Sequence, residues 1–287
     1  MNIFLLTVIT LVILYPLYFT VIASISDPHA VQRGEVILWF KKFTLDPYKN
    51  VFANKEIWTG YKNSIINTVI VVLFSLSLTM PAAFVLSRRD LKGKKFLTNY
   101  FIFTMYFAGG MIPSYLLVKN LGLMNTRWAL ILPAGFSVYN MIIARTSMQS
   151  TLSEELFEAA KIDGCSIFGM FFRIALPLSK AIIAVIALYV AVAHWGSWFN
   201  AMLYIQDKDL YPLQYVLRGI LIQNQQMDII DTSGMDGELI TSQLMRAYMA
   251  QGMKYSLIFI SAAPMLAAYP FVQKHFVKGV MVGAVKQ

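Results

Sequence analysis

The sequence predicts an all-α membrane protein that crosses the bilayer with six helices and forms a single domain over residues 1–287. Of its residues, 57% are hydrophobic and 14% are charged, whereas soluble domains are about 45–50% apolar and about 25% charged. The apolar residues gather in six long runs, and a dense basic stretch separates the second run from the third. One cysteine and three histidines exclude a disulfide framework and a zinc cluster.

Each apolar run is long enough to cross a hydrocarbon core about 30 Å thick, although the fourth is at the short end of the range. Backbone groups in lipid must be satisfied internally, so the runs are expected to be helices. They cover residues 3–23, 65–86, 97–118, 128–144, 181–203 and 255–272. The first run is too long for the apolar core of a signal peptide and lacks a basic leader, so we expect a retained span.

The charges between the runs predict the orientation of the chain. The loop 87–96 holds five basic residues and only one acid, Asp90, which is typical of a cytoplasmic loop. The loop 204–253 holds six acidic and three basic residues, and we expect it on the outer face. The mixed segment 24–62 does not decide the matter. Six spans then place both the N-terminus and the C-terminus in the cytoplasm.

The inner loop 151–177, between the fourth and fifth runs, predicts a short amphipathic helix. Thr151 and Glu154 have the spacing of a capping box, and Gly164 stands where a left-handed C-cap is expected. One face of the helix carries the apolar and small residues Leu152, Leu156, Ala159 and Ala160. From this pattern alone, a plain interfacial connector and a docking surface for a partner are both possible.

The spacing within this loop resembles a known motif. Glu158-Ala159-Ala160 is followed by Gly164 and later by Leu176-Pro177, which is similar to the EAA loop of binding-protein-dependent ABC importer permeases. The resemblance implies that this loop holds the coupling helix, which docks on a cytoplasmic ATPase subunit. The residues that correspond to the coupling positions are Glu155, Glu158, Ala159, Ala160, Asp163 and Gly164. Cys165 stands where the family prefers alanine.

The resemblance extends over most of the chain. Residues 107–113, 128–133 and 194–199 are similar to stretches of maltose-type carbohydrate permeases, especially those for complex oligosaccharides and polysaccharide fragments. It implies the maltose-type ABC permease fold. The C-terminal tail also resembles that family, and Gly283 and Lys286 correspond to a tail that reaches toward the ATPase dimer.

No motif in the chain predicts catalysis or nucleotide binding. The phosphate-binding pattern G-x-x-x-x-G-K-[ST] is absent, and the glycines at 109 and 110 lie inside an apolar run. There they predict, with Pro113, a helix break or a close-packing site. The acidic stretch 228–238 lacks EF-hand spacing, so we expect no metal site. We therefore expect no catalytic residue and no cofactor bound by this chain, with ATP and Mg²⁺ used by partner subunits.

A pathway for a sugar requires polar groups and flat aromatic faces. Candidates occur late in the fourth run and along the fifth: Tyr139, Asn140, His194, Trp195, Trp198 and Asn200. For the tryptophans, an aromatic belt at the lipid interface or helix packing is an alternative interpretation. For Asn140 and His194, a pathway is favoured because polar groups at membrane depth need partners.

The resemblance implies a permease subunit of an ATP-driven importer in the bacterial inner membrane, which moves an oligosaccharide delivered by an extracytoplasmic solute-binding protein. Its expected partners are a second homologous permease subunit, two ATP-binding subunits and the binding protein, which the outer loop 204–253 would contact. An ion-coupled sugar carrier and a membrane-embedded enzyme acting on lipid-linked sugars are the alternatives. Neither is favoured, because paired intramembrane carboxylates and repeated halves are absent.

Overall fold

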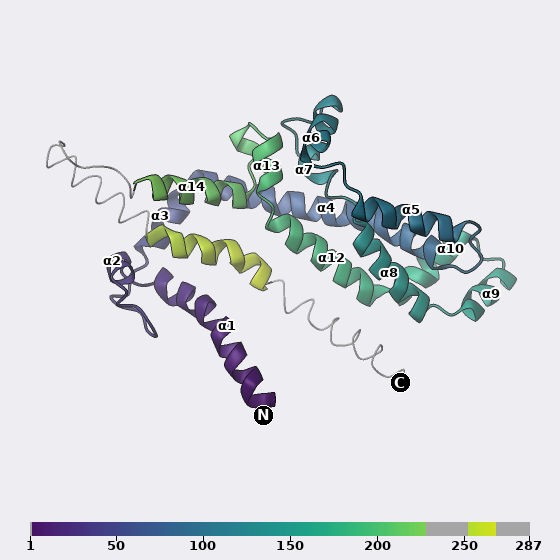
Figure 1. Ribbon diagram of the computed structural model, residues 1–287, viewed down its shortest axis with the longest axis horizontal. Coiled ribbons are helices and arrows are strands. Elements are labelled where there is room, and N and C mark those ends of the chain that lie inside the picture. Colours follow the sequence, from purple (N-terminus) through teal and green to yellow (C-terminus); the bar gives the residue numbers. More distant parts are fainter. Residues whose placement is uncertain (1, 228–251, 268–287) are drawn as a thin grey trace. The chain divides into compact units, whose positions relative to one another are not determined.

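The computed structural model describes residues 2–227 and 252–267, and every regular element in these two stretches is a helix (Figure 1). The predicted all-α class is therefore confirmed. The described residues form two compact units, one drawn from Met1–Lys62 with Tyr211–Ala267 and the other from Asn63–Leu210. The helix α4 (Lys55–Ser87) contributes its first eight residues to the first unit and the remainder to the second.

The first unit joins the two ends of the described chain. A ring contact between Phe19 and Tyr255, with centroids 5.7 Å apart, links its N-terminal and C-terminal helices. The Tyr61 hydroxyl also donates a hydrogen bond to the carbonyl of Ile260. Besides the start of α4, its helices are α1 (Asn2–Ser24), α2 (Pro28–Gln32), α3 (Asp46–Ala53), α14 (Leu213–Met227) and the helix Gly252–Ala267.

The second unit surrounds an apolar core in which Phe84, Met148 and Ile186 are almost fully buried. These side chains come from α4, α8 and α12, so the core joins helices that are far apart in the sequence. After α4 the elements are α5 (Lys94–Tyr106), α6 (Met111–Asn120), α7 (Trp128–Ile131), α8 (Val138–Thr151), α9 (Glu154–Ile162), α10 (Ile167–Gly169), the π-helix η1 (Met170–Ala175), α11 (Leu176–Leu178), α12 (Lys180–Trp195), α13 (Phe199–Tyr204) and the 3₁₀-helix η2 (Lys208–Leu210).

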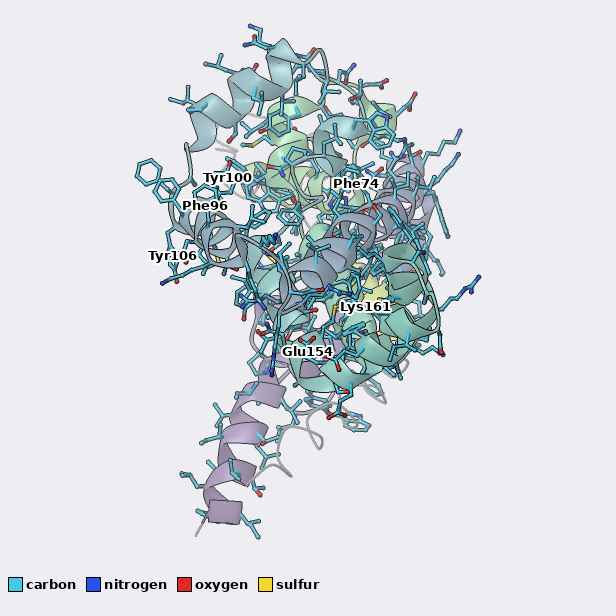
Figure 2. The ribbon with its side chains drawn as sticks, turned by 90° about the vertical axis from the view of Figure 1, so that its right-hand side faces the viewer. Phe74, Phe96, Tyr100, Tyr106, Glu154 and Lys161 are labelled. Carbon is cyan, nitrogen blue, oxygen red and sulfur yellow. The ribbon has the colours of Figure 1, made fainter. Side chains whose placement is uncertain are left out.

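Two helices of the described residues, α1 and α4, are each long and apolar enough to cross a membrane. Two bent helix pairs would raise the number to four if each pair is one span. The surfaces of these helices suit lipid or subunit contact. Large apolar side chains are exposed along α1, and Figure 2 shows Phe96, Tyr100 and Tyr106 projecting from α5, where they are 74%, 56% and 80% exposed. The count of six spans stays a prediction, and part of the run 255–272 lies outside the described residues.

The run 97–118 is not one continuous helix. Helix α5 ends at Tyr106, α6 begins at Met111, and the two axes meet at 106°. The break occurs at the predicted glycines, since Gly110 has φ +89°, which favours glycine because it has no Cβ. Of the two alternatives predicted for this place, a helix break and a close-packing site, the structure shows the break.

The runs 128–144 and 181–203 are interrupted as well. In the first, α7 ends at Ile131 and α8 begins only at Val138. A Cβ at Gly135, in the gap, would stand 2.3 Å from the Phe74 ring of α4, so a larger residue there would force that ring to move. In the second, α12 ends at Trp195 and α13 follows after three residues. These segments were apolar enough to predict helices, but apolar content does not reveal local bends.

A polar cluster inside the second unit holds one of these bends. The Arg127 guanidinium, just before α7, donates hydrogen bonds to Asn67 Oδ1 at 3.0 Å and to Asn63 Oδ1 at 2.6 Å. Asn63 Nδ2 in turn donates to the carbonyl of Asp209 at 2.7 Å. Asn63 and Asn67 are buried, and a buried polar group is costly unless it is hydrogen-bonded. The cluster therefore fixes the segment before α7 and the η2 turn against α4.

The close approach of α4 and α14 in the first unit gives a test of the packing. A Cβ at Gly60 would stand 3.0 Å from the Cα of Leu213, whereas a Cβ at Gly219 meets nothing within 4 Å. Gly60→Val should destabilise the protein by about 1–3 kcal/mol because the backbone of α14 must move. The matched control Gly219→Val should melt at or above the wild-type temperature. Thermal unfolding in detergent measures both, and equal melting temperatures for the two variants would contradict this packing.

Candidate functional site

The ends of α9 are fixed by its own sequence. Ser153 is the N-cap, and its hydroxyl accepts the Leu156 N–H at 3.4 Å. At the C-terminus, Gly164 has φ +72°, and the N–H groups of Gly164 and Cys165 donate to the carbonyls of Lys161 and Ala160 at 3.0 and 2.8 Å. This is a Schellman motif. The predicted glycine C-cap is therefore confirmed.

The predicted capping box at Thr151 is wrong. The Thr151 hydroxyl donates to the Ser147 carbonyl at 2.9 Å and belongs to the last turn of α8. The hydroxyl of Ser153, two residues later, takes the capping role because α8 runs on through Thr151. The sequence offers both hydroxyls before the two glutamates, and only the end of α8 decides between them.

The expected face of α9 is buried only in part, since Leu152 and Ala160 are buried and Ala159 is not. Phe157 and Ala160, three residues apart, are 4% and 7% exposed, whereas Ala159 is exposed and Leu156 is half-buried. Five of the six predicted coupling residues lie on the exposed part of the loop: Glu155, Glu158, Ala159, Asp163 and Gly164. Ile162, 87% exposed, lies one turn after Glu158. The sixth residue, Ala160, anchors the helix to the core.

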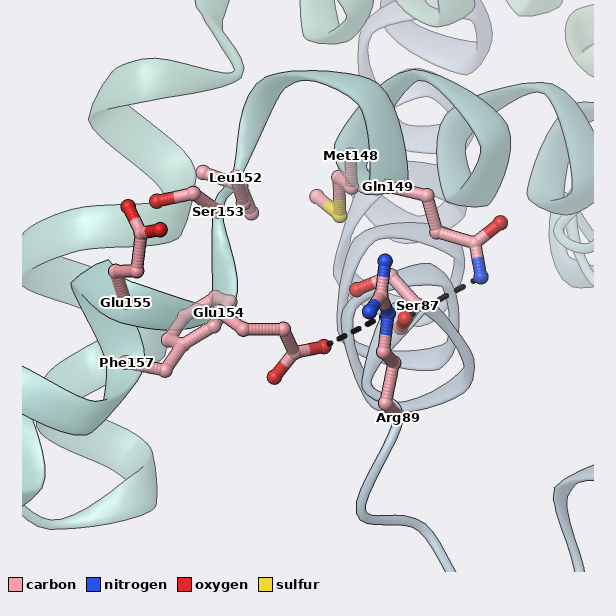
Figure 3. Close-up of a pocket in the computed structure, with 9 residues that line it drawn as sticks. All are labelled: Ser87, Arg89, Met148, Gln149, Leu152, Ser153, Glu154, Glu155 and Phe157. Atoms are coloured by element: carbon pink, nitrogen blue, oxygen red, sulfur yellow. Dashed lines mark hydrogen bonds and ion pairs between the residues drawn. The ribbon is translucent and has the colours of Figure 1, made fainter.

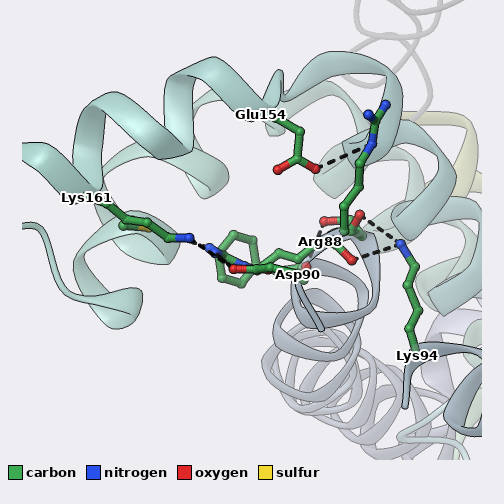
Figure 4. Close-up of polar contacts among 9 residues, drawn as sticks. Arg88, Asp90, Lys94, Glu154 and Lys161 are labelled. Carbon is green, nitrogen blue, oxygen red and sulfur yellow. Dashed lines mark hydrogen bonds and ion pairs between the residues drawn. The ribbon is translucent and has the colours of Figure 1, made fainter. Parts of the chain in front are cut away.

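The position of α9 is set by charged residues in the loop between α4 and α5 (Figure 4). The Asp90 carboxylate accepts hydrogen bonds from Arg88 Nε at 2.8 Å and Nη2 at 2.5 Å, and it also binds Lys161 Nζ at 3.1 Å. Arg89 and Glu154 approach to 3.6 Å at the other end of α9. Both ends of α9 are therefore bound to the α4–α5 loop. Within that loop, Asp90 stands 71 residues before Lys161 in the sequence.

Arg88 forms the buried centre of this arrangement. It is 8% exposed, and its guanidinium carbon lies 5.2 Å from the ring centre of Phe157 and 5.9 Å from that of Phe84. A buried guanidinium needs a carboxylate, and Asp90 supplies it in bidentate geometry. The hydrogen bonds from Arg88, followed by those from Lys161, hold the pKa of the Asp90 carboxyl well below its usual range. Asp90 therefore stays ionised at neutral pH.

Sequence reasoning used Arg88 and Asp90 only to orient the loop and missed their structural role. The available signal was Asp90 itself, which is the one acid among the five basic residues of the loop 87–96.

Beside the network, a cavity of about 510 Å³ opens between the end of α8 and the start of α9 (Figure 3). Its lining includes Arg89, Gln149, Glu154 and Glu155, so this cavity is polar and charged.

A second cavity of about 510 Å³ brings together four of the six predicted pathway residues: Tyr139, Asn140, His194 and Asn200. They come from α8, α12 and α13, and the bend before α8 supplies Ala134 and Phe136. Tyr189 adds an aromatic face, and among the described residues no charged side chain lines this cavity. Uncharged hydrogen-bonding groups beside aromatic rings suit a ligand with hydroxyls and C–H faces.

The two remaining pathway candidates lie elsewhere. Trp195 is 5% exposed within the packed structure, and Trp198 contacts Phe199 edge-on with ring centres 5.6 Å apart. Neither lines the second cavity. The tail residues Gly283 and Lys286, and residues 228–251 of the outer loop 204–253, lie outside the described residues.

The network around Asp90 gives a second test. Asp90→Asn leaves the buried Arg88 charge without its carboxylate, which should cost about 1–3 kcal/mol locally. We expect faster amide hydrogen exchange over α9. The control Asp46→Asn removes an exposed pair with Lys49, 3.0 Å apart on α3, and should leave exchange in α9 unchanged. Unaltered α9 exchange in Asp90→Asn would show that the network does not hold the helix.

Comparison with known proteins places the chain in a family. The family model "Binding-protein-dependent transport system inner membrane component" matches residues 57–281. The chain is 42% identical to Protein LplC of Bacillus subtilis (strain 168), over 94% of this chain and 88% of that protein. It is 39% identical to the polygalacturonan/rhamnogalacturonan transport system permease protein YtcP of the same bacterium, over 96% of this chain and 93% of that protein.

A solved structure agrees with these relatives. A chain in the crystal structure of a bacterial ABC transporter involved in the import of the acidic polysaccharide alginate matches with a TM-score of 0.83 and 30% identity. The match covers 96% of this chain and 95% of that chain. The predicted family is therefore confirmed: the chain belongs to the inner-membrane components of binding-protein-dependent transport systems, which are permease subunits and not ATPases.

Proposed function

We propose that this chain is the permease subunit of an ATP-driven importer that moves an oligosaccharide delivered by an extracytoplasmic solute-binding protein. The observation that carries the proposal is the exposed face of α9, where Glu155, Glu158 and Ile162 surround the small Ala159 on a helix held at both ends. Relatives named for polygalacturonan/rhamnogalacturonan and for arabinooligosaccharides support the substrate class.

The exposed face of α9 is suited to transmit force from a partner. Its small residue permits close approach, its acids complement basic groups, and Ile162 supplies apolar area to bury. Two ATP-binding subunits would use ATP and Mg²⁺, and their closure would move α9. Because Lys161 and Glu154 bind the loop that follows α4, displacement of α9 would also displace the end of α4. ATP drives the change only through different affinities for the two states.

The remaining partners follow from the same proposal. A second homologous permease subunit would complete the pathway, and the outer loop 204–253 would contact the binding protein. The orientation with both termini in the cytoplasm is supported by the basic loop 87–96, which carries the partners of α9. The tail with Gly283 and Lys286 would reach the ATPase subunits on that side.

We assign the second cavity to the sugar pathway. Asn140, Asn200 and His194 offer hydrogen bonds to sugar hydroxyls, and Tyr139 and Tyr189 offer ring faces to C–H patches. A pathway must bind weakly enough to release its cargo, and uncharged groups meet that need. Trp195 and Trp198 would then support the fold of α12 and α13 and would not contact the sugar.

Charge reversal at α9 tests the coupling role. Glu158→Lys should abolish or strongly reduce ATP-driven uptake, because the introduced ammonium group would face the basic groups proposed on the ATPase as a like charge. Gly164→Pro should do the same, since proline cannot adopt φ +72°. Glu35→Lys, at an exposed ion pair with Arg33 in the first unit, is the matched control. Full ATP-driven uptake in Glu158→Lys and Gly164→Pro, at normal expression, would refute the coupling role.

Substitution in the second cavity tests the pathway. Asn140→Ala should raise the KM for uptake by several-fold while ATPase coupling is retained, because a hydrogen bond to the sugar is lost. Trp198→Ala, outside the cavity, should leave the KM unchanged. Uptake into vesicles that contain ATP, with binding protein and labelled oligosaccharide added outside, gives both values. The assignment fails if Trp198→Ala changes the KM and Asn140→Ala does not.

A further inference from the structure

The segment 36–43 between α2 and α3, here called the 36–43 loop, turns back along α1. The hydroxyls of Tyr15 and Tyr18 donate hydrogen bonds to the carbonyls of Ile37 and Leu38 at 3.1 and 2.6 Å. With a rise of 1.5 Å per residue, Tyr18 and Tyr15 lie about 9 and 14 Å before the end of α1 at Ser24. Helical side chains also lean toward the N-terminus. The loop therefore lies beside the last third of α1 and not beyond its end.

Both ends of the 36–43 loop are fixed. Val36 is 3% exposed and packs into a small apolar cluster at the end of α1. At the other end, the Lys41 carbonyl accepts the Asp27 N–H at 3.0 Å, and the Thr44 N–H donates to the Ile25 carbonyl at 3.0 Å. All of these contacts lie within the first unit. The backbone of the loop is thus held in place while its central side chains are left uncovered.

The central side chains are apolar and aromatic. Leu38, Trp39 and Phe43 are 68%, 67% and 59% exposed. Phe40 lies between the two other rings, with centres 5.3 Å from Trp39 and 5.9 Å from Phe43. Lys41 and Lys42 stand within the same stretch. Segments that lie at a membrane interface typically combine tryptophan, phenylalanine and leucine with lysine.

The depth of the loop identifies what covers it. α1 is apolar enough to cross a membrane, and Leu14, Leu17 and Val21 on the same stretch of helix are 49%, 63% and 41% exposed. Lipid in contact with these side chains would also reach a loop bonded to Tyr15 and Tyr18. Backbone carbonyls need partners where water is scarce, and the two tyrosine hydroxyls provide them for Ile37 and Leu38.

We propose that the 36–43 loop is an interfacial membrane anchor. It inserts Leu38, Trp39 and Phe43 into the boundary between headgroups and acyl chains, in the leaflet at the C-terminal end of α1. Lys41 extends toward the lipid phosphates, as long basic side chains do at this depth, whereas Lys42 Nζ lies 4.0 Å from Asp27. With its backbone bonded to Tyr15 and Tyr18, the anchor fixes the depth and tilt of α1.

Spin labelling of the full chain tests the depth of the loop. In a Cys165→Ala background, which removes the single cysteine, nitroxides are attached at Leu38→Cys and, as a control, at Arg33→Cys, whose side chain is 60% exposed in the same unit. The proteins are placed in vesicles of phosphatidylethanolamine and phosphatidylglycerol. We expect the ratio of collisions with oxygen to collisions with a water-soluble nickel chelate to be several-fold higher at position 38 than at position 33.

Two outcomes would overturn the anchor. Equal ratios at positions 38 and 33 would place the loop in water. A label at position 38 that neither reagent reaches would mean that protein covers the loop instead of lipid. Circular dichroism of each labelled protein confirms that the helices are retained, and both substituted side chains are exposed, so misfolding is not expected to obscure the result.

Removal of the two hydroxyls tests how the loop is held. The double substitution Tyr15→Phe and Tyr18→Phe keeps the rings of α1 but leaves the carbonyls of Ile37 and Leu38 without their donors. The nitroxide at position 38 should become more mobile, and its oxygen-to-nickel ratio should fall toward that of position 33. An unchanged spectrum and an unchanged ratio would show that the tyrosines do not set the depth of the loop.

Discussion

One carboxylate joins α9 to the α4–α5 loop in the second unit. Asp90 neutralises the buried Arg88 guanidinium, and the same carboxylate binds Lys161 near the end of α9. Without it, a charge that is packed between the rings of Phe84 and Phe157 would have no ionic partner among the described residues. The Phe157 ring of α9 covers the Arg88 guanidinium and Lys161 binds its carboxylate partner, so α9 packs against the α4–α5 loop. A short helix of nine residues, marginal by itself, thereby acquires a defined position.

Interrupted helices explain how a polar cavity forms within an apolar protein. The connections before α8 and after α12 leave the helical path, and the freed segments bring the side chains of Asn140, His194 and Asn200 to one place. Irregular backbone at membrane depth is tolerated where it is buried in protein or lines a cavity. Gly135 permits the first departure because a side chain there would collide with Phe74. The helix breaks are therefore part of what makes a pathway possible.

The two units use different means to fix their polar groups. In the second unit, side-chain amides of α4 receive the Arg127 guanidinium, and a carboxylate receives Arg88. In the first unit, tyrosine hydroxyls on α1 receive the backbone of the 36–43 loop. Each arrangement supplies hydrogen bonds or ion pairs to backbone or charged groups where water is scarce. Each also leaves one neighbouring surface exposed. On α9 that surface is acidic and small, whereas on the 36–43 loop it is aromatic.

The amino-acid sequence by itself determined the helical class, the family, the helix α9 with its Gly164 cap, and the break near Gly110. These features depend on local composition, on residue spacing and on the conformational freedom of glycine, all of which a linear sequence displays. Only the tertiary structure decided that Ser153 caps α9, that Phe157 and Ala160 form its buried face, and that Asp90 holds it. It also separated Asn140 and His194 from Trp195 and Trp198. These features depend on contacts between residues up to 71 positions apart, and on bends whose direction is set by packing against other helices, which no local pattern encodes.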